Sequence, residues 1–368
     1  LSKLQSLIKI VTLSLDSCRL NEGAKELEDF IINSLSQTYV PMTRDDIWDD
    51  SMETLERRNV IYAVLGYTLL MIDILLHSYC PYITNYLYLL CFKHKDLVLL
   101  ESWPKINTNL VNNEIENTID KSKLVISLVN AARMKAKFKR RWPINTVVIC
   151  TQDRNLLESS GLSEILKKQL NTMSVDIKVA NFSNLFEKIN FLNTENLVSL
   201  SAKLKVNKIA PRLKNDLKNA LESFNQVNYD DLFDQLNSKS NFNLKHMSGE
   251  IELSLDDVEF SYTGKTPYIM MESEQENVAV FIDTTRSSKL IAMGLMKDIA
   301  RNIQQLRKER GFVPTEILLS AHISNLDSDD LLSLENYKNE LAYYVRVKQV
   351  IITPNKLVGI EYKEIEID

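Results

Sequence analysis

The stretch Ala131-Ala-Arg-Met-Lys-Ala-Lys-Phe-Lys-Arg-Arg-Trp-Pro-Ile144 guides the interpretation of the whole sequence. It is the end of a long helical pattern that changes abruptly, at Trp142-Pro143, into a β-branched run. Residues 121–152 contain eight Lys or Arg and no Asp or Glu, although the chain has a formal net charge of −5. The positive charge is therefore local, and such a focus attracts a polyanion, most often a nucleic acid. The alternative is a solvated helix end whose cations oppose the helix dipole.

The composition is that of a globular protein with long regular elements. The chain has 368 residues, 45% of them hydrophobic and 25% charged, with only 8 Gly and 8 Pro. This length predicts two or three domains. The negative net charge argues against nucleic-acid binding over the whole surface, so any RNA contact must use the basic stretches.

Several other classes of protein are disfavoured. The chain has no C-x-x-C pair, which argues against a zinc site or a disulfide framework and suits a reducing cytosol; its cysteines are Cys18, Cys80, Cys91 and Cys150. The apolar stretch 60–76 is interrupted by Gly66 and Asp73, and we expect a core helix with too few apolar residues to span a bilayer. No signal peptide is evident. Because the chain starts inside a helical pattern and without Met, we expect a piece of a longer protein.

The first part of the sequence has helical periodicity. Apolar residues recur at 3.6-residue spacing, and the predicted helices cover about 4–15, 22–39 (ending near Pro41), 52–77, a short segment from Pro81, and 114–139. We expect these helices to form an antiparallel bundle.

The remainder mixes strand and helix patterns. Strands are predicted at 146–151, 175–180, 196–206, 250–260, 268–272, 278–283, 316–323, 346–353 and 358–366. Helices are predicted at 156–170, at 211–224 with Pro211 in the first turn, and at 287–310. The predicted fold is therefore α+β and multidomain: a helical bundle with a long junction helix (1–144), a small α/β domain (145–226) and a mixed α/β domain (227–368).

Separate stretches resemble one family in the same order along the chain. The opening stretch fits A-A-R-x-K-A-x-x-K-x-R-x-P, a junction motif of isoleucyl-tRNA synthetases of the archaeal and eukaryotic type. Five further segments are similar to segments of that family, and they are Leu76–Thr84, Leu100–Pro104, Val206–Lys214, Val278–Thr285 (the A-L-D-T-T signature) and Ile303–Phe312. Together they cover nearly the whole chain. A valyl- or leucyl-type relative should lack the last two segments, so isoleucine is preferred.

The departures from the family pattern matter as well. Leu99 and Ser102 stand where the family has His and Asp, and Ser36-Gln-Thr-Tyr-Val-Pro41 replaces S-R-W-Y-I-R. The second change removes an aromatic ring and two arginines that could stack on bases or pair with phosphate. The ATP-handling signatures HIGH and KMSKS are absent. We therefore expect no catalytic residue and no activation of isoleucine by this chain alone.

The resemblance implies a function, partners and cofactors. It implies the C-terminal part of a class I isoleucine–tRNA ligase, in which the bundle grips the anticodon stem and loop of tRNA(Ile). ATP and Mg would belong to the full-length enzyme, and the catalytic and editing domains of the same enzyme would be the other partners. No membrane or DNA partner is expected, and the location would be cytoplasmic.

Three basic clusters are the candidate tRNA contacts. The junction cluster is Arg133, Lys135, Lys139, Arg141 and Trp142; the second is Lys203, Lys205, Lys208, Arg212 and Lys214; the third is Arg301, Arg307, Lys308 and Arg310. Each has a structural alternative: Trp142 packing under the bundle, Arg133 capping a neighbouring helix, or Arg301 holding its helix to a sheet.

Two further expectations concern sites and function. The four histidines lack the spacing of metal ligands, and Asp256-Asp257 is expected to be a solvated edge rather than a metal site, so no metal is predicted. The alternative function is a stand-alone protein-interaction or assembly subunit built on the same modules.

Overall fold

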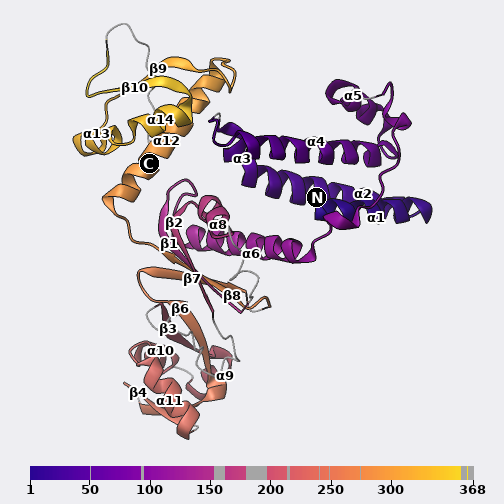
Figure 1. Cartoon of the computed structure of the whole chain (residues 1–368). Coiled ribbons are helices and arrows are strands. Elements are labelled where there is room, and N and C mark those ends of the chain that lie inside the picture. Colours follow the sequence, from indigo (N-terminus) through magenta and orange to yellow (C-terminus); the bar gives the residue numbers. More distant parts are fainter. Residues whose placement is uncertain are drawn as a thin grey trace. The chain divides into compact units, whose positions relative to one another are not determined.

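The computed structural model describes residues 1–49, 51–92, 95–152, 162–179, 197–213, 216–239, 241–247, 249–273, 275–357 and 363. These residues form a helical unit, 1–124, and a mixed unit, 125–368 (Figure 1). The combination of helices with small sheets confirms the coarse fold class. The antiparallel order of the bundle and the three-domain division stay predictions.

The helical unit follows the predicted periodicity. Its helices are α1 (Ser2–Asp16), α2 (Leu20–Asp29), the π-helical η1 (Phe30–Tyr39), α3 (Val40–Trp48), α4 (Leu55–His77), α5 (Pro81–Cys91), the short 3₁₀ turns η2 (Val98–Leu100) and η3 (Thr108–Leu110), and the first half of α6 (Asn113–Lys135). In α1 the residues at i, i+3, i+4 and i+7 are all buried, and they are Leu4, Leu7, Ile8 and Val11. Leu27 and Leu75 complete that core.

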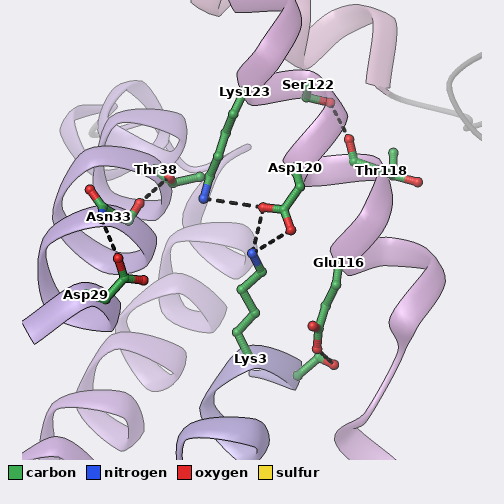
Figure 2. Close-up of polar contacts among 10 residues, drawn as sticks. Lys3, Asp29, Asn33, Thr38, Glu116, Thr118, Asp120, Ser122 and Lys123 are labelled. Carbon is green, nitrogen blue, oxygen red and sulfur yellow. Dashed lines mark hydrogen bonds and ion pairs between the residues drawn. The ribbon is translucent and has the colours of Figure 1, made fainter. Parts of the chain in front are cut away.

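The start of α1 is tied to α6 by polar contacts. Figure 2 shows the Lys3 ammonium reaching both carboxylate oxygens of Asp120, at 2.6 and 2.8 Å, with Lys123 at 3.5 Å from the same carboxylate. The Ser2 hydroxyl also donates to Glu116. Because Asp120 is half exposed, these ion pairs contribute at most about 1 kcal/mol each. The Lys3–Asp120 pair joins α1 to α6, whereas the Lys123–Asp120 pair lies within α6.

Helix does not end near Pro41, which corrects the prediction. The chain remains helical from α2 through η1 into α3, with Pro41 in the first turn of α3. A proline ring in an α-helix clashes with the carbonyl four residues earlier. The wider π turns of η1 end at Tyr39, two residues before Pro41. Within η1 the Thr38 hydroxyl donates to the Asn33 carbonyl, five residues back, at 2.5 Å (Figure 2).

Helix α4 is 23 residues long and, by length and composition, apolar enough to cross a membrane. The expectation that it has too few apolar residues was therefore wrong. A single such helix is a weak indication, because core helices of soluble proteins pass the same test. In the helical unit it buries Ile61, Ile72, Ile74 and Leu75.

The mixed unit is organised around a four-stranded sheet of order β2-β1-β8-β7. Its strands are β1 (Ile144–Thr151), β2 (Thr172–Val179), β7 (Tyr268–Ser273) and β8 (Val278–Asp283), and α8 (Leu162–Leu170) packs on β2. β1 pairs in parallel with β2 and antiparallel with β8. Every residue of β8 is buried, which explains its continuous apolar sequence.

The mixed unit also contains two groups of elements, each with its own apolar core. The first contains β3 (Val198–Leu204), α9 (Val206–Leu213), α10 (Leu217–Phe224), α11 (Tyr229–Lys239), β4 (Asn241–His246), β5 (Gly249–Ser254), the 3₁₀ turn η5 (Leu255–Asp257) and β6 (Val258–Gly264) around one apolar core. The second contains α12 (Ser288–Glu309), α13 (Ser328–Glu335), α14 (Lys338–Val345) and the parallel pair β9 (Leu318–Ser324) and β10 (Val347–Thr353).

Several local predictions need correction. α6 ends at Lys135 rather than 139, because Lys137 is left-handed, with φ 57°. Pro211 lies inside α9 instead of opening a helix at 211. The predicted strand 250–260 is β5 and β6 separated by η5, and α11 and β4 were not anticipated. Most of the predicted strand 358–366 and the start of the helix predicted at 156–170 fall outside the described residues.

The helical unit buries the Asp73 carboxylate away from the hydrogen-bond donors of the residues that the structure describes. Asp73 in α4 is 6% exposed, and its Oδ2 has no hydrogen-bond partner among the described residues. Burial raises the pKa of Asp73 from 3.8 to about 6. Between about pH 4 and pH 6 the unfolded carboxyl releases its proton before the folded one does, so the free energy of unfolding falls as the pH rises.

Asp73→Asn should therefore stabilise the chain by about 1 to 3 kcal/mol at pH 7.5, with little gain at pH 4. Urea unfolding at both pH values measures this, with the exposed Asp16→Asn in α1 as the matched control. A wild-type stability that stays flat between pH 4 and pH 6 would contradict the prediction.

Candidate nucleic-acid interface

The basic junction begins where α6 stops. The Phe138 N–H donates to the Arg133 carbonyl at 2.8 Å, and the Lys137 N–H donates to the Met134 carbonyl at 3.1 Å. Lys137 occupies the left-handed position that glycine usually takes at a helix C-terminus. A lysine there costs about 1 kcal/mol, and the surrounding contacts must offset that cost.

Arg133 supplies the central contact of the junction. The side chain is 2% exposed, and its guanidinium donates to the carbonyls of Lys139 (3.3 Å), Trp142 (2.7 Å), Leu170 (2.7 Å) and Asn171 (3.0 Å). Burial, and secondarily the charge of Arg140, lower its pKa to about 10, so it stays protonated at neutral pH. Arg133 thus joins the junction to the turn between α8 and β2, and its donors are directed at protein carbonyls.

Asn171 fixes the same loop from the other side. It is left-handed, with φ 49°, and its amide donates to the carbonyls of Arg140 (3.1 Å) and Arg141 (2.8 Å). Its Oδ1 accepts from Lys297 of α12 at 2.6 Å. The junction, the α8–β2 turn and α12 are therefore connected through one side chain.

Asp298 in α12 holds the last two junction residues. The Trp142 indole N–H donates to Oδ2 at 2.8 Å, and Arg141 Nε lies 3.1 Å from Oδ1. Asp298 is buried, so the pair is screened little by solvent. One turn earlier, Gly294 lets the Trp142 ring approach, since a Cβ at that position would lie 2.5 Å from the ring. Trp142 therefore packs on α12 within the mixed unit.

Four cations of the junction remain on its surface. Exposed side chains are those of Lys135, Lys137, Lys139 and Arg140, and Arg141 is half-buried. Because the loop between them is held by Arg133, Asn171 and Asp298, their backbone positions are defined without a ligand. A rigid, acid-free basic loop of this kind is suited to binding phosphate groups.

Acidic partners offset the second cluster. Arg212 lies 3.0 Å from Asp257, Lys208 lies 3.9 Å from Asp256, and Lys203 is opposite Glu259 in the β3–β6 register. Lys205 is half-buried, and Lys214 falls outside the described residues. The local charge here is close to balanced.

The Asp256-Asp257 pair is only partly a solvated edge. Asp256 is 88% exposed on its side chain, whereas Asp257 is buried and accepts from the backbone and hydroxyl of Ser254. Burial acts to raise the pKa of Asp257, but the donors from Ser254 and Arg212 outweigh it and hold the pKa below its usual value. Asp257 therefore caps η5 and anchors Arg212, which the acidic pattern did not reveal.

In the third cluster one arginine is structural. Arg307 is 7% exposed, and its guanidinium donates to the carbonyls of Val345, Arg346, Val313 and Glu316. Arg301, Lys308 and Arg310 are exposed along α12. No group of three His, Cys, Asp or Glu that could hold a metal occurs among the residues that the structure describes.

One basic residue near the junction was missed by sequence reasoning. Arg286, at the end of the loop before α12, lies over the rings of Phe138 and Trp142, with its Cζ 4.5 and 5.0 Å from their centroids. It follows directly after the A-L-D-T-T segment and lies 144 residues beyond Trp142, so no local charge pattern connects it to the junction.

Comparison with known proteins finds a family similarity in the first part of the chain. Residues 1–149, which include the whole basic junction, match the family described as the anticodon-binding domain of tRNA ligase. This part of the chain is therefore similar to that family of domains.

The wider similarity is to the isoleucine–tRNA ligases. The chain is 26% identical to that of Pyrococcus abyssi over 84% of its length, 29% identical to that of Clostridium novyi over 85%, and 23% identical to that of Methanocella arvoryzae over 92%. The chain spans only 27%, 29% and 30% of these relatives. The predicted resemblance to the C-terminal part of an isoleucine–tRNA ligase is confirmed.

Gly294→Ala should destabilise the chain by about 1 to 3 kcal/mol, because the added methyl displaces the Trp142 ring from α12. The matched control is Gly66→Ala in α4, where a Cβ meets nothing within 4 Å and the change should stabilise the helix by up to about 1 kcal/mol. Equal effects in chemical denaturation would rule out the packing role of Gly294.

Arg133→Ala should lower stability by about 2 to 4 kcal/mol, since four buried or half-buried carbonyls each lose one donor. The carbonyls of Lys139 and Asn171 keep a second donor, the backbone N–H of Trp142 and of Ile144 respectively. Met134→Ala, at a neighbouring position that is 80% exposed, should change stability by less than about 0.5 kcal/mol. Urea unfolding measures both, and an unchanged Arg133→Ala midpoint would exclude the bracing role.

Proposed function

We propose that this chain is the tRNA-binding part of an isoleucine–tRNA ligase and that it grips the anticodon stem and loop of tRNA(Ile). The observation that carries this proposal is the basic junction: four exposed cations on a loop held at both ends, inside the region that matches an anticodon-binding domain. In this role the helices of the helical unit form an antiparallel bundle.

Within this proposal fewer residues contact tRNA than the three basic clusters predicted from the sequence contain. Lys135, Lys139 and the neighbouring Lys137 and Arg140 contact phosphates, while Arg133 and Trp142 hold the loop in shape. Arg301 and Lys308 are secondary candidates on α12, because they are exposed. Lys205, Lys208 and Arg212 are weaker candidates, since two of them face acids.

Because the chain lacks the HIGH and KMSKS signatures, we propose that it binds tRNA and that another domain of the enzyme carries out catalysis. The full-length enzyme would use isoleucine, ATP and Mg in its catalytic domain, in the cytoplasm, and this chain would supply tRNA affinity. Phosphate contacts place the RNA, and identity comes from anticodon bases read on their edges. The isolated chain should therefore show no ATP–pyrophosphate exchange.

An assembly or interaction subunit is the second candidate. It is favoured by exposed apolar side chains on one short helix, α5, where Tyr82, Tyr86 and Leu90 are more than half exposed. Such a surface suits a protein partner as well as it suits an RNA.

Binding of the purified chain to bulk tRNA tests the proposal. Wild type should bind at 50 mM salt and enrich isoleucine tRNAs when the retained RNA is sequenced. The combined change of Lys135, Lys137 and Arg140 to Ala should weaken binding at least tenfold and make the dependence of log affinity on log salt shallower by about 2 to 3, one phosphate contact being lost per residue.

The matched control is Lys245→Ala in β4, whose side chain is 81% exposed and lies 3.4 Å from Glu250. It should leave affinity unchanged. Absence of binding by wild type at 50 mM salt would refute the tRNA role and favour the interaction subunit. Binding without enrichment of isoleucine tRNAs would refute identity reading by this chain.

A further inference from the structure

Two acid-free basic segments, far apart in the sequence, meet around Trp142. The first is 133–142, and the second is 284–297, which contains Arg286, Lys289 and Lys297 and no Asp or Glu. Trp142 joins them: Arg286 of the second segment lies over its ring, and its indole N–H donates to Asp298, the acidic residue that directly follows the second segment. The basic surface is therefore composite, and the sequence run shows only part of it.

Arg286 differs from the bracing arginines of the same unit. Arg133 and Arg307 are buried and direct their donors at backbone carbonyls. Arg286 is exposed, and its guanidinium has no hydrogen-bond or ion-pair partner among the residues that the structure describes. Its guanidinium instead makes cation-π contacts with the rings of Phe138 and Trp142.

The two ring contacts restrict this guanidinium before any anion binds. A cation over an aromatic face is attracted by the ring, so the rotamer freedom of Arg286 is already reduced. A guanidinium carries five N–H donors in one plane. A planar fork of this kind matches two oxygens of one phosphate.

We propose that Arg286 contacts a backbone phosphate of the bound tRNA and that the RNA surface extends from the junction onto the start of α12, with the exposed Lys289 beside it. This inference rests on the proposed function and names a residue outside the predicted clusters. A brace that only packs the loop at 284–287 against Phe138 is the competing role, and the two roles differ in their dependence on salt.

The experiment compares Arg286→Ala, Arg286→Lys and the control Lys245→Ala in the whole chain, with bulk tRNA as the probe and salt varied from 50 to 200 mM. Arg286→Ala should weaken binding about tenfold and make the slope of log affinity against log salt shallower by about 0.7 to 0.9, the value for one phosphate. Arg286→Lys keeps the charge and should retain the slope while recovering only part of the affinity.

Each outcome separates the two claims. If wild type binds and the triple junction variant is weakened while Arg286→Ala matches Lys245→Ala, the role of Arg286 is overturned and the proposed function stands. A weaker Arg286→Ala with an unchanged slope and a lower unfolding midpoint identifies a brace and also overturns it. If wild type fails to bind, the proposed function itself falls. Should Arg286→Ala not fold, an affinity and slope of Arg286→Lys equal to wild type overturn the bidentate contact.

Discussion

The mixed unit depends on one buried guanidinium at the point where helix becomes sheet. α6 ends, the chain reverses through a left-handed lysine, and β1 begins within nine residues of Lys135. Such a turn leaves carbonyls without helical or strand partners, and burying them unpaired would cost several kcal/mol. Arg133 donates to two carbonyls of this turn, those of Lys139 and Trp142, and to two carbonyls of the α8–β2 turn, so the basic loop keeps its shape while its remaining cations face outward. Charge at this junction therefore has two separate uses, one structural and one directed at solvent.

The regular elements were largely predictable because they depend on short-range periodicity. The buried stripe of α1 and the continuous apolar run of β8 each have a local signature. Element ends were less predictable, since they depend on contacts that are distant in the sequence. The helical path through Pro41 follows a π-helical segment, and α6 ends before a lysine with positive φ. Neither has a clear signal in the sequence.

The position of the candidate site could be predicted from the sequence, but the role of each basic residue in it could not. The basic run identified the junction, but charge patterning cannot distinguish an arginine that binds carbonyls from one that faces solvent. Burial separates Arg133 from Lys135, and acidic partners separate Arg212 from both. Arg286 could not be predicted from the sequence for a different reason. The pairing of β1 with β8 brings the loop after Asp283 to the junction, and only this pairing places Arg286 beside it.

The attachment of Arg141 and Trp142 to a single residue of α12 has a mechanical consequence. Asp298 lies near the middle of α12, a 22-residue helix whose later turns pack against α13 and α14. Displacing the basic loop would therefore also disturb the apolar core that α12 shares with α13 and α14, and this restrains the loop more than a free surface loop of the same sequence.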